Sequence, residues 1–137
     1  MSFCGVIPKD LAVGALWPQI GALVASALPY GRGEYALEDI RDGIARGEMF
    51  AAGVVNERAE VEFVVTCAVA TFPQKQVLYV QYGAGRGGVR AKDALIAAAR
   101  TLNCDWIETC CRESVARLYR RAGFDDAYRV CILEVPQ

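Results

Sequence analysis

The sequence contains no histidine. Ser-His-Asp and Cys-His catalysis and most catalytic zinc sites need an imidazole, so these mechanisms are excluded. The six cysteines include no CxxC pair, which indicates neither a zinc site nor a disulfide framework, and we expect free, mostly buried thiols. Chemistry on this chain must therefore use carboxylates, tyrosines, cysteine thiols or backbone amides.

The chain also lacks an excess charge of either sign and a long uninterrupted apolar run. Fifteen basic residues face sixteen acidic ones, so no overall field favours nucleic acid or an anionic membrane as a partner. The first residues have neither the basic start nor the apolar stretch of a signal peptide, and Pro18 and Gly21 interrupt the longest apolar segment. We expect a cytoplasmic protein with no membrane segment.

A composition of 54% hydrophobic and 23% charged residues over 137 positions indicates one globular domain spanning residues 1–137. Apolar residues at helical spacing predict helices, and period-two runs of β-branched residues predict strands. Leu95, Ala98 and Leu118 occupy the apolar stripes of the last two helices, so we expect them to face the sheet. The predicted helices are 10–28, 37–46, 89–102 and 113–122, and the predicted strands are 3–7, 49–55, 61–72, 77–82, 105–110 and 128–135.

Residues 83–88, GAGRGG, join a predicted strand to a predicted helix. Glycines let a ligand approach the backbone, and the first amides of a helix attract anions, so this turn is a candidate phosphate site. A dinucleotide-binding Rossmann unit is excluded because the turn follows an antiparallel meander rather than a first βαβ strand. A P-loop is excluded because no Lys-Ser/Thr pair follows the last glycine.

The segment 116–124, ARLYRRAGF, is similar to the LYxxxGF signature of the Gcn5-related N-acetyltransferase (GNAT) family. The order β-α-α-β-β-β-α-β-α-β also resembles that family over nearly the whole chain. The resemblance implies an α/β (α+β) GNAT-like fold, with a mixed, twisted sheet of six to seven strands and four helices. It also implies a catalytic role for Tyr119, as the acid that protonates the leaving thiolate of coenzyme A.

The same resemblance implies that acetyl-CoA is the cofactor. The family's phosphate motif fits best from Arg86 to Ala91, although Val89 stands at its middle glycine. Arg112 stands where many members carry asparagine. The cofactor-binding residues implied in this way are Tyr82, Arg86, Gly87, Gly88, Val89, Arg90, Ala91 and Arg112, with no metal ligand.

The general base is left open because no acid lies on strand 77–82, where the family often carries a glutamate. Glu62 and Glu108 are carboxylates that could reach a cleft, or they are surface residues of their strands. Cys110 and Cys111 suggest a ping-pong route through an acyl-thioester, but packing roles and direct transfer are favoured.

Several segments, including 33–40 and 73–80, also resemble the small GNAT-like proteins of tailed bacteriophages. Two functions therefore stand side by side. One is an acetyl-CoA-dependent N-acetyltransferase acting on a small-molecule or protein amine. The other is a non-catalytic virion-associated protein that binds other virion proteins, located in the host cytoplasm or in the virion.

Overall fold

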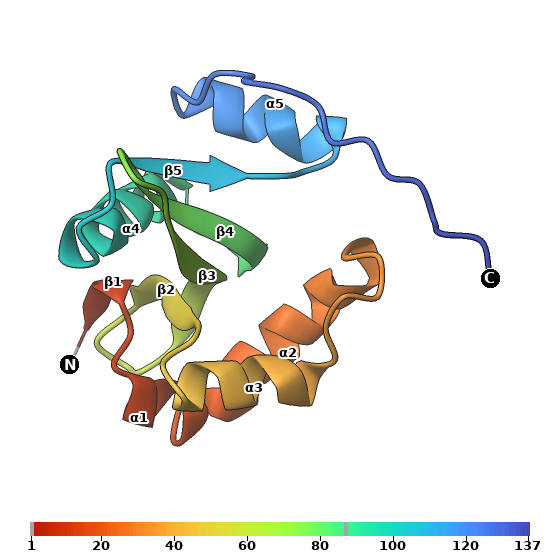
Figure 1. Ribbon diagram of the computed structural model, residues 1–137. Helices are drawn as coiled ribbons and strands as arrows, with labels where there is room; N and C mark the ends of the chain where they lie inside the picture. Colours follow the sequence, from red (N-terminus) through yellow and green to blue (C-terminus); the bar gives the residue numbers. More distant parts are fainter. Residues whose placement is uncertain (1, 87) are drawn as a thin grey trace.

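A computed structural model of the protein describes residues 2–86 and 88–137. Its sheet has the strand order β1-β2-β3-β4-β5, and every neighbouring pair is antiparallel except the parallel pair β4 and β5 (Figure 1). Short turns join β2 to β3 and β3 to β4, which is why these strands are antiparallel neighbours. The strands are β1 (Phe3–Val6), β2 (Phe50–Val55), β3 (Val61–Thr71), β4 (Gln76–Gly85) and β5 (Trp106–Thr109).

Helices cover both faces of the sheet. On one face lie α1 (Lys9–Val13), α2 (Trp17–Ala27) and α3 (Leu37–Ala45), with a 3₁₀ turn, η1 (Leu28–Tyr30), after α2. On the other face, α4 (Gly88–Thr101) packs across β1, β2 and β5. The last helix, α5 (Glu113–Arg121), follows β5 and lies beside it in Figure 1.

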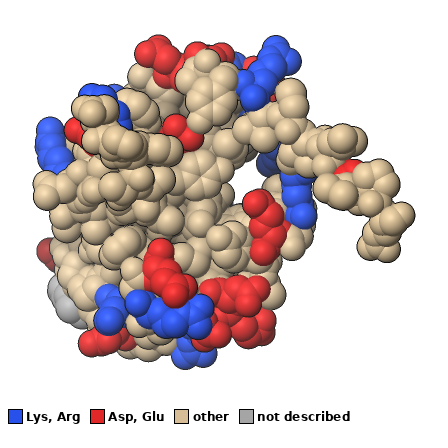
Figure 2. All heavy atoms as spheres, in the orientation of Figure 1, with Lys and Arg blue, Asp and Glu red and all other residues tan. Residues whose placement is uncertain are grey.

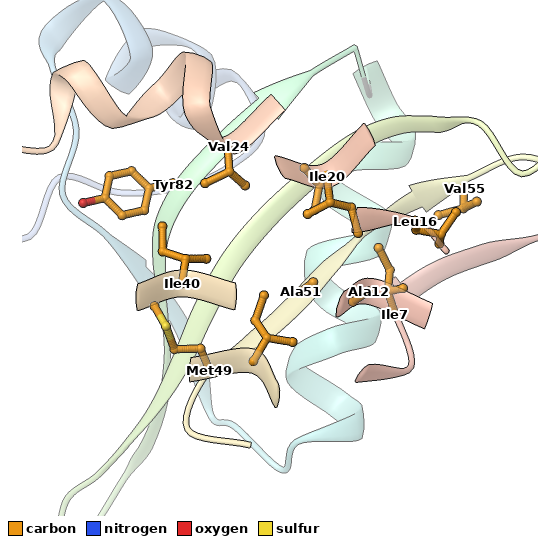
Figure 3. Packing of buried hydrophobic residues seen from close by; sticks show 12 residues of the cluster. Ile7, Ala12, Leu16, Ile20, Val24, Ile40, Met49, Ala51, Val55 and Tyr82 are labelled. Atoms are coloured by element: carbon orange, nitrogen blue, oxygen red, sulfur yellow. The ribbon is translucent and has the colours of Figure 1, made fainter. Parts of the chain in front are cut away.

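Side chains that alternate along β2 and β3 supply two hydrophobic clusters, one on each face. Ala51 and Val64 face α1 to α3, where Ile20 and Ile40 pack against them in the cluster shown in Figure 3. The next residues along, Ala52 and Val65, face α4 and pack with its apolar stripe. The second cluster includes Leu78, Val80, Leu95 and Ala98, so the expected sheet-facing positions of Leu95 and Ala98 are confirmed.

The predicted helix 10–28 is wrong in one respect, because the structure splits it into α1 and α2. The N–H of Trp17 donates to the carbonyl of Gly14 at 3.1 Å, and Pro18 lies in the first turn of α2. Proline has no N–H to donate to a carbonyl four residues earlier, so it suits a helix start better than a helix interior. The described residues therefore contain five α-helices rather than four.

Two carboxyl-terminal expectations were also wrong, although strand 105–110 and helix 113–122 are confirmed as β5 and α5. The described residues form a five-stranded sheet rather than one of six to seven strands, because residues 128–135 pair with no strand. Residues 125–137 are exposed and leave the body of the protein past the end of β5 (Figure 1). Leu118 is 62% exposed and so does not face the sheet.

Candidate functional site

The two parallel strands, β4 and β5, stop pairing halfway along β4. β5 pairs with Val77 to Val80 and ends at Thr109, whereas β4 continues to Gly85. The Thr109 hydroxyl donates to the Val80 carbonyl at 3.2 Å, at the last paired position. Beyond it, the β5-facing edge of β4 has no strand partner among the described residues. Such an edge presents backbone donors and acceptors to an extended, amide-containing ligand.

A β-bulge lies at the same point of β4. Thr66 of β3 pairs with Tyr82 and Cys67 pairs with Val80, so Gln81 has no opposite residue. A bulge increases the local twist and bends the strand, which helps β4 to diverge from β5. The side-chain oxygen Oε1 of Gln81 is buried and accepts no hydrogen bond from any described residue. Buried polar atoms are nearly always paired, so this oxygen can accept a hydrogen bond from water or from a ligand.

Tyr119 comes from α5 and lies near the point where the strands separate. Its ring packs edge-on against Phe124 with 4.9 Å between ring centroids, which holds the LYxxxGF segment together. Burial raises the pKa of the phenol, the nearby Cys111 raises it further, and Thr109 acts in the opposite direction. A phenol with a raised pKa stays protonated at neutral pH and can serve as a proton donor.

The glycine-rich turn is shorter than expected, because Gly83 to Gly85 belong to strand β4. Gly87 lies outside the described residues. Gly88 begins α4 with a φ of 51°, and apart from its chain neighbours and the backbone of its own helix, no described atom lies within 4 Å of where its Cβ would be. The backbone can therefore be approached here, at the amino end of a helix.

The residues around this helix start are solvent-facing. Val89 is 80% exposed, and Arg86 is exposed beside it. Arg90 forms an ion pair with Glu62, whose oxygen lies 3.6 Å from its guanidinium nitrogen. Ala91 is half-buried in the same turn. The structure thus brings together four of the predicted cofactor residues and Gly88 at one helix end.

Two predicted cofactor residues lie elsewhere, on the side of α2 and α3. Tyr82 is buried in the first cluster, where its ring meets that of Tyr35 edge-on with 6.1 Å between centroids. Arg112 stacks on the ring of Tyr30, with its guanidinium carbon 3.9 Å from the ring centroid. This cation-π contact links the start of α5 to η1.

Tyrosines and carboxylates gather on that side of the strand opening. A hydrogen bond with Cys110 is the main cause that raises the pKa of Tyr79, followed by burial, and the charges of Glu34 and Glu108 raise it further. Burial also raises the pKa of Tyr82, with a smaller contribution from Glu34. We call Glu34, Tyr35, Tyr79, Tyr82 and Glu108 the acidic tyrosine cluster. The Tyr128 hydroxyl donates to Glu108 at 2.6 Å beside it.

In Figure 2 the surface is notched between the departing carboxyl-terminal segment and the end of the α2–α3 layer, and acidic and basic atoms border the notch. The carboxylates contribute negative charge without a described ion-pair partner for Glu34 or Glu108. Glu34 and Glu108 favour a cationic group on this side, where Arg112 contributes the opposing positive charge.

The remaining candidates for acid-base or nucleophilic roles have other surroundings. Glu62 is occupied by Arg90 and also accepts a hydrogen bond from Asn56 at 3.1 Å, so it acts as a structural ion-pair residue. All six cysteines carry free thiols, as expected, but the expectation that most are buried is wrong, because only Cys67 is buried and only Cys104 is half-buried. Burial raises the pKa of Cys111, which keeps its thiol protonated and weakens it as a nucleophile. Within the described ranges, no cluster of potential metal ligands is present.

Sequence reasoning missed three members of the acidic tyrosine cluster, namely Glu34, Tyr35 and Tyr79. Glu34 and Tyr35 lie in the segment between η1 and α3, where no periodic pattern assigns a direction to the side chains. Tyr79 is a polar aromatic residue within the largely apolar strand 77–82, and this position could have marked it as a candidate site residue.

No protein-family model and no curated sequence matches this chain. Solved structures do match it over nearly their full lengths. Aminoglycoside 6'-N-acetyltransferase AAC(6')-Ih from Acinetobacter baumannii is 12% identical, with a TM-score of 0.68 and coverage of 100% of this chain and 99% of that one.

Ribosomal-protein-alanine N-acetyltransferase from Brucella melitensis is 11% identical, with a TM-score of 0.69 and coverage of 99% and 100%. An acetyltransferase from Trypanosoma brucei is 14% identical, with a TM-score of 0.63 and coverage of 98% and 100%. At these identities the likeness establishes the fold and nothing finer. None of the helices in the described part of the chain is long and apolar enough to cross a membrane. The protein therefore shares the fold of these acetyltransferase structures.

Proposed function

We propose that this protein is an acetyl-CoA-dependent N-acetyltransferase that transfers the acetyl group directly to an amine. The observation that carries the proposal is the position of Tyr119, a phenol with a raised pKa near Thr109, where β4 and β5 separate. The neighbouring acetyltransferase structures support the same function at the level of the fold.

The residues at the opening suit acetyl-CoA. The unpaired edge of β4 after Val80 offers backbone groups to the amides of the pantetheine arm, and the unpartnered Oε1 of Gln81 can accept from an N–H. The start of α4, with Arg86 and the open approach at Gly88, suits the pyrophosphate. When bound, acetyl-CoA supplies an activated acetyl thioester.

Side chains of the protein would then donate a proton to the leaving thiolate and accept a proton from the attacking amine. Tyr119 holds a proton on its phenolic oxygen, ready for the thiolate that leaves. The carboxylates of Glu34 and Glu108 draw a protonated amine toward the acidic tyrosine cluster, and one of them accepts its proton before attack. Tyr79 and Tyr82 stay neutral because their pKa values are raised, so they line this side as uncharged hydrogen-bonding rings.

The test is binding of acetyl-CoA to the purified protein, measured by calorimetry and by thermal shift. Binding to the folded state should raise the melting temperature with the logarithm of the ligand concentration. Val89→Asp should weaken binding, because its carboxylate would stand in the first turn of α4 where the pyrophosphate is expected. Val89→Asn is the matched control, since it has the same shape without the charge and should bind nearly as well as the wild type.

If millimolar acetyl-CoA gives neither heat nor a thermal shift, the enzyme proposal fails. The alternative is a non-catalytic interaction protein with the same fold. In that case a pull-down should capture partner proteins, including virion proteins, although the protein does not bind acetyl-CoA. Equal loss of binding in both Val89 variants would point to a damaged fold instead, and circular dichroism of each variant separates these cases.

A further inference from the structure

The β-bulge at Gln81 turns two tyrosines toward the same face of the sheet. On a regular strand, Tyr79 and Tyr82 would point to opposite faces, because side chains alternate. Here Tyr82 pairs with Thr66 of β3. Tyr79 pairs with Ala68, which is two residues further along β3 and therefore has the same orientation as Thr66. Paired residues share a face, so both tyrosines lie on the side of α1 to α3.

The same face receives a carboxylate from β5. Glu108 is the parallel partner of Tyr79, so the two side chains lie next to each other. Glu108 is half-buried, and Tyr128 donates a hydrogen bond to only one of its two oxygens, Oε2. Because β5 ends at Thr109, this carboxylate lies one residue from the point where β4 and β5 separate.

A buried hydroxyl group without a partner lies on this side as well. Tyr82 is 6% exposed, and its hydroxyl forms no hydrogen bond with a described residue. Figure 3 shows this hydroxyl pointing away from the apolar cluster. It lies against Gly31, where an added Cβ would come within 2.5 Å of the oxygen, so it is directed toward the loop between η1 and α3. Buried polar groups are normally paired, which makes this hydroxyl a contact for a ligand.

The loop between η1 and α3 adds charges of both signs. The N–H of Glu34 donates to the carbonyl of Gly31 at 3.3 Å, and this turn keeps Glu34 close to Tyr30. The ring of Tyr30 carries the guanidinium group of Arg112, whose carbon lies 3.9 Å from the ring centroid. Arg112 has no ion-pair partner among the described residues, and stacking leaves the N–H groups at the edge of its plane available.

We propose that this face binds a free diamino acid, a molecule with two ammonium groups and one carboxylate. The carboxylates of Glu34 and Glu108 and the guanidinium of Arg112 match the charges of such a ligand in sign and in number. The α-ammonium and α-carboxylate groups, which share one carbon, bind at the loop to Glu34 and Arg112. The side-chain ammonium reaches Glu108 at the strand opening. The Tyr82 hydroxyl accepts a hydrogen bond from an ammonium group of the ligand.

Acetylation of this diamino acid rests on the proposed function, whereas its binding does not. The nitrogen held by Glu108 lies beside the strand opening, so the side-chain nitrogen is acetylated and the α-amine stays free. Glu108 takes one proton from the ammonium group, and the nitrogen forms a bond to the acetyl carbon while the C–S bond breaks. Tyr119 protonates the leaving thiolate and is restored by the second proton that the nitrogen loses.

The first test measures binding to the full-length protein without acetyl-CoA. Lysine, cadaverine and ε-aminocaproate are matched probes, because cadaverine lacks the carboxylate and ε-aminocaproate lacks the α-ammonium group. By saturation-transfer NMR and thermal shift, lysine should bind at least about 10-fold more tightly than either of the others, since each of these lacks one charge-assisted contact. Equal dissociation constants for lysine and cadaverine would overturn the proposal.

Two variants assign the ligand charges to side chains. Arg112→Gln should weaken lysine binding by about 10-fold and leave cadaverine binding unchanged, because cadaverine has no carboxylate. Glu34→Gln should weaken the binding of lysine and cadaverine but not that of ε-aminocaproate. Arg117→Gln, at an exposed arginine of α5, is the matched control and should bind all three probes like the wild type. Equal losses for all three probes in Arg112→Gln would reveal a purely structural contact with Tyr30 and contradict the assignment.

Assays with acetyl-CoA separate this proposal from that of the enzyme. Lysine should exceed cadaverine as an acceptor by about 10-fold in kcat/KM, and mass spectrometry should locate the acetyl group on the side-chain nitrogen. Comparable turnover of cadaverine, or acetylation of the α-nitrogen, would overturn the diamino acid assignment and leave the enzyme proposal in place. Selective lysine binding without turnover would support the ligand assignment and contradict the enzyme proposal.

Discussion

Tyr119 is the side chain on which the proposed chemistry depends. Tyr119→Phe removes the proton donor while it keeps the ring that packs on Phe124. Turnover should fall by about 10²-fold, since general acid catalysis contributes that order of rate, while acetyl-CoA binding stays near the wild-type value. Steady-state kinetics and calorimetry on the same samples check this. An unchanged turnover would remove Tyr119 from the mechanism.

The ionisation of Tyr119 gives an independent prediction. Its pKa is raised above the ordinary value of 10.0, so the folded protein holds this proton more tightly than the unfolded chain does. The resulting stabilisation is fully present below about pH 10 and is lost as the pH rises through the folded-state pKa. Denaturant unfolding between pH 9 and 11 should therefore show a shallower alkaline loss of stability for Tyr119→Phe than for the wild type.

We expect the side-chain oxygen of Gln81 to affect both the free energy of unfolding and the proposed binding of acetyl-CoA. Its Oε1 is buried without a donor among the described residues, which costs about 1 to 3 kcal/mol in the ligand-free protein. Gln81→Met keeps the size of the side chain and removes the polar atoms, so we expect it to raise the free energy of unfolding and to weaken acetyl-CoA binding. Urea denaturation and calorimetry measure the two effects. A variant that is less stable would show that the oxygen has a partner.

Among the elements, α4 joins the hydrophobic core to the candidate cofactor site. Leu95 is 4% exposed on the face that packs against the sheet, so Leu95→Ala should lower the free energy of unfolding by about 2 to 5 kcal/mol. Val89→Ala on the same helix is the control, and because Val89 is exposed its effect should stay within about 0.5 kcal/mol. Similar losses in the two variants would mean that the faces of α4 are misassigned.

Elements with a strong local pattern were predictable from the sequence. The β2–β3–β4 meander and α4 follow from period-two and helical spacing, and the LYxxxGF segment pointed to Tyr119. The break between α1 and α2 was harder to place, because Gly14 and Pro18 each permit a kink as well as a full interruption. The register shift at Gln81 was not predictable, since a bulge depends on the pairing of two strands rather than on one.

The acidic tyrosine cluster and the exposure of Leu118 were not predictable either, because both depend on contacts between segments that are distant in the sequence. Glu34 and Tyr79 come from segments more than forty residues apart, and only the packing of the amino-terminal helices, with α2 against β4, brings them together. Leu118 lies in an apolar stripe that correctly predicted a helix, but this side of the helix does not pack against the sheet, and Leu118 stays 62% exposed. Side-chain environment at such positions is set by tertiary contacts rather than by local pattern.

At the scale of the whole molecule, the amino-terminal layer and α4 enclose the core, whereas β5, α5 and the last residues remain open to solvent. The candidate site lies at the boundary between these two parts, because Tyr119 comes from the open part and β4 from the enclosed one. Tyr119 is therefore positioned by a helix without buried residues, through its contact with Phe124.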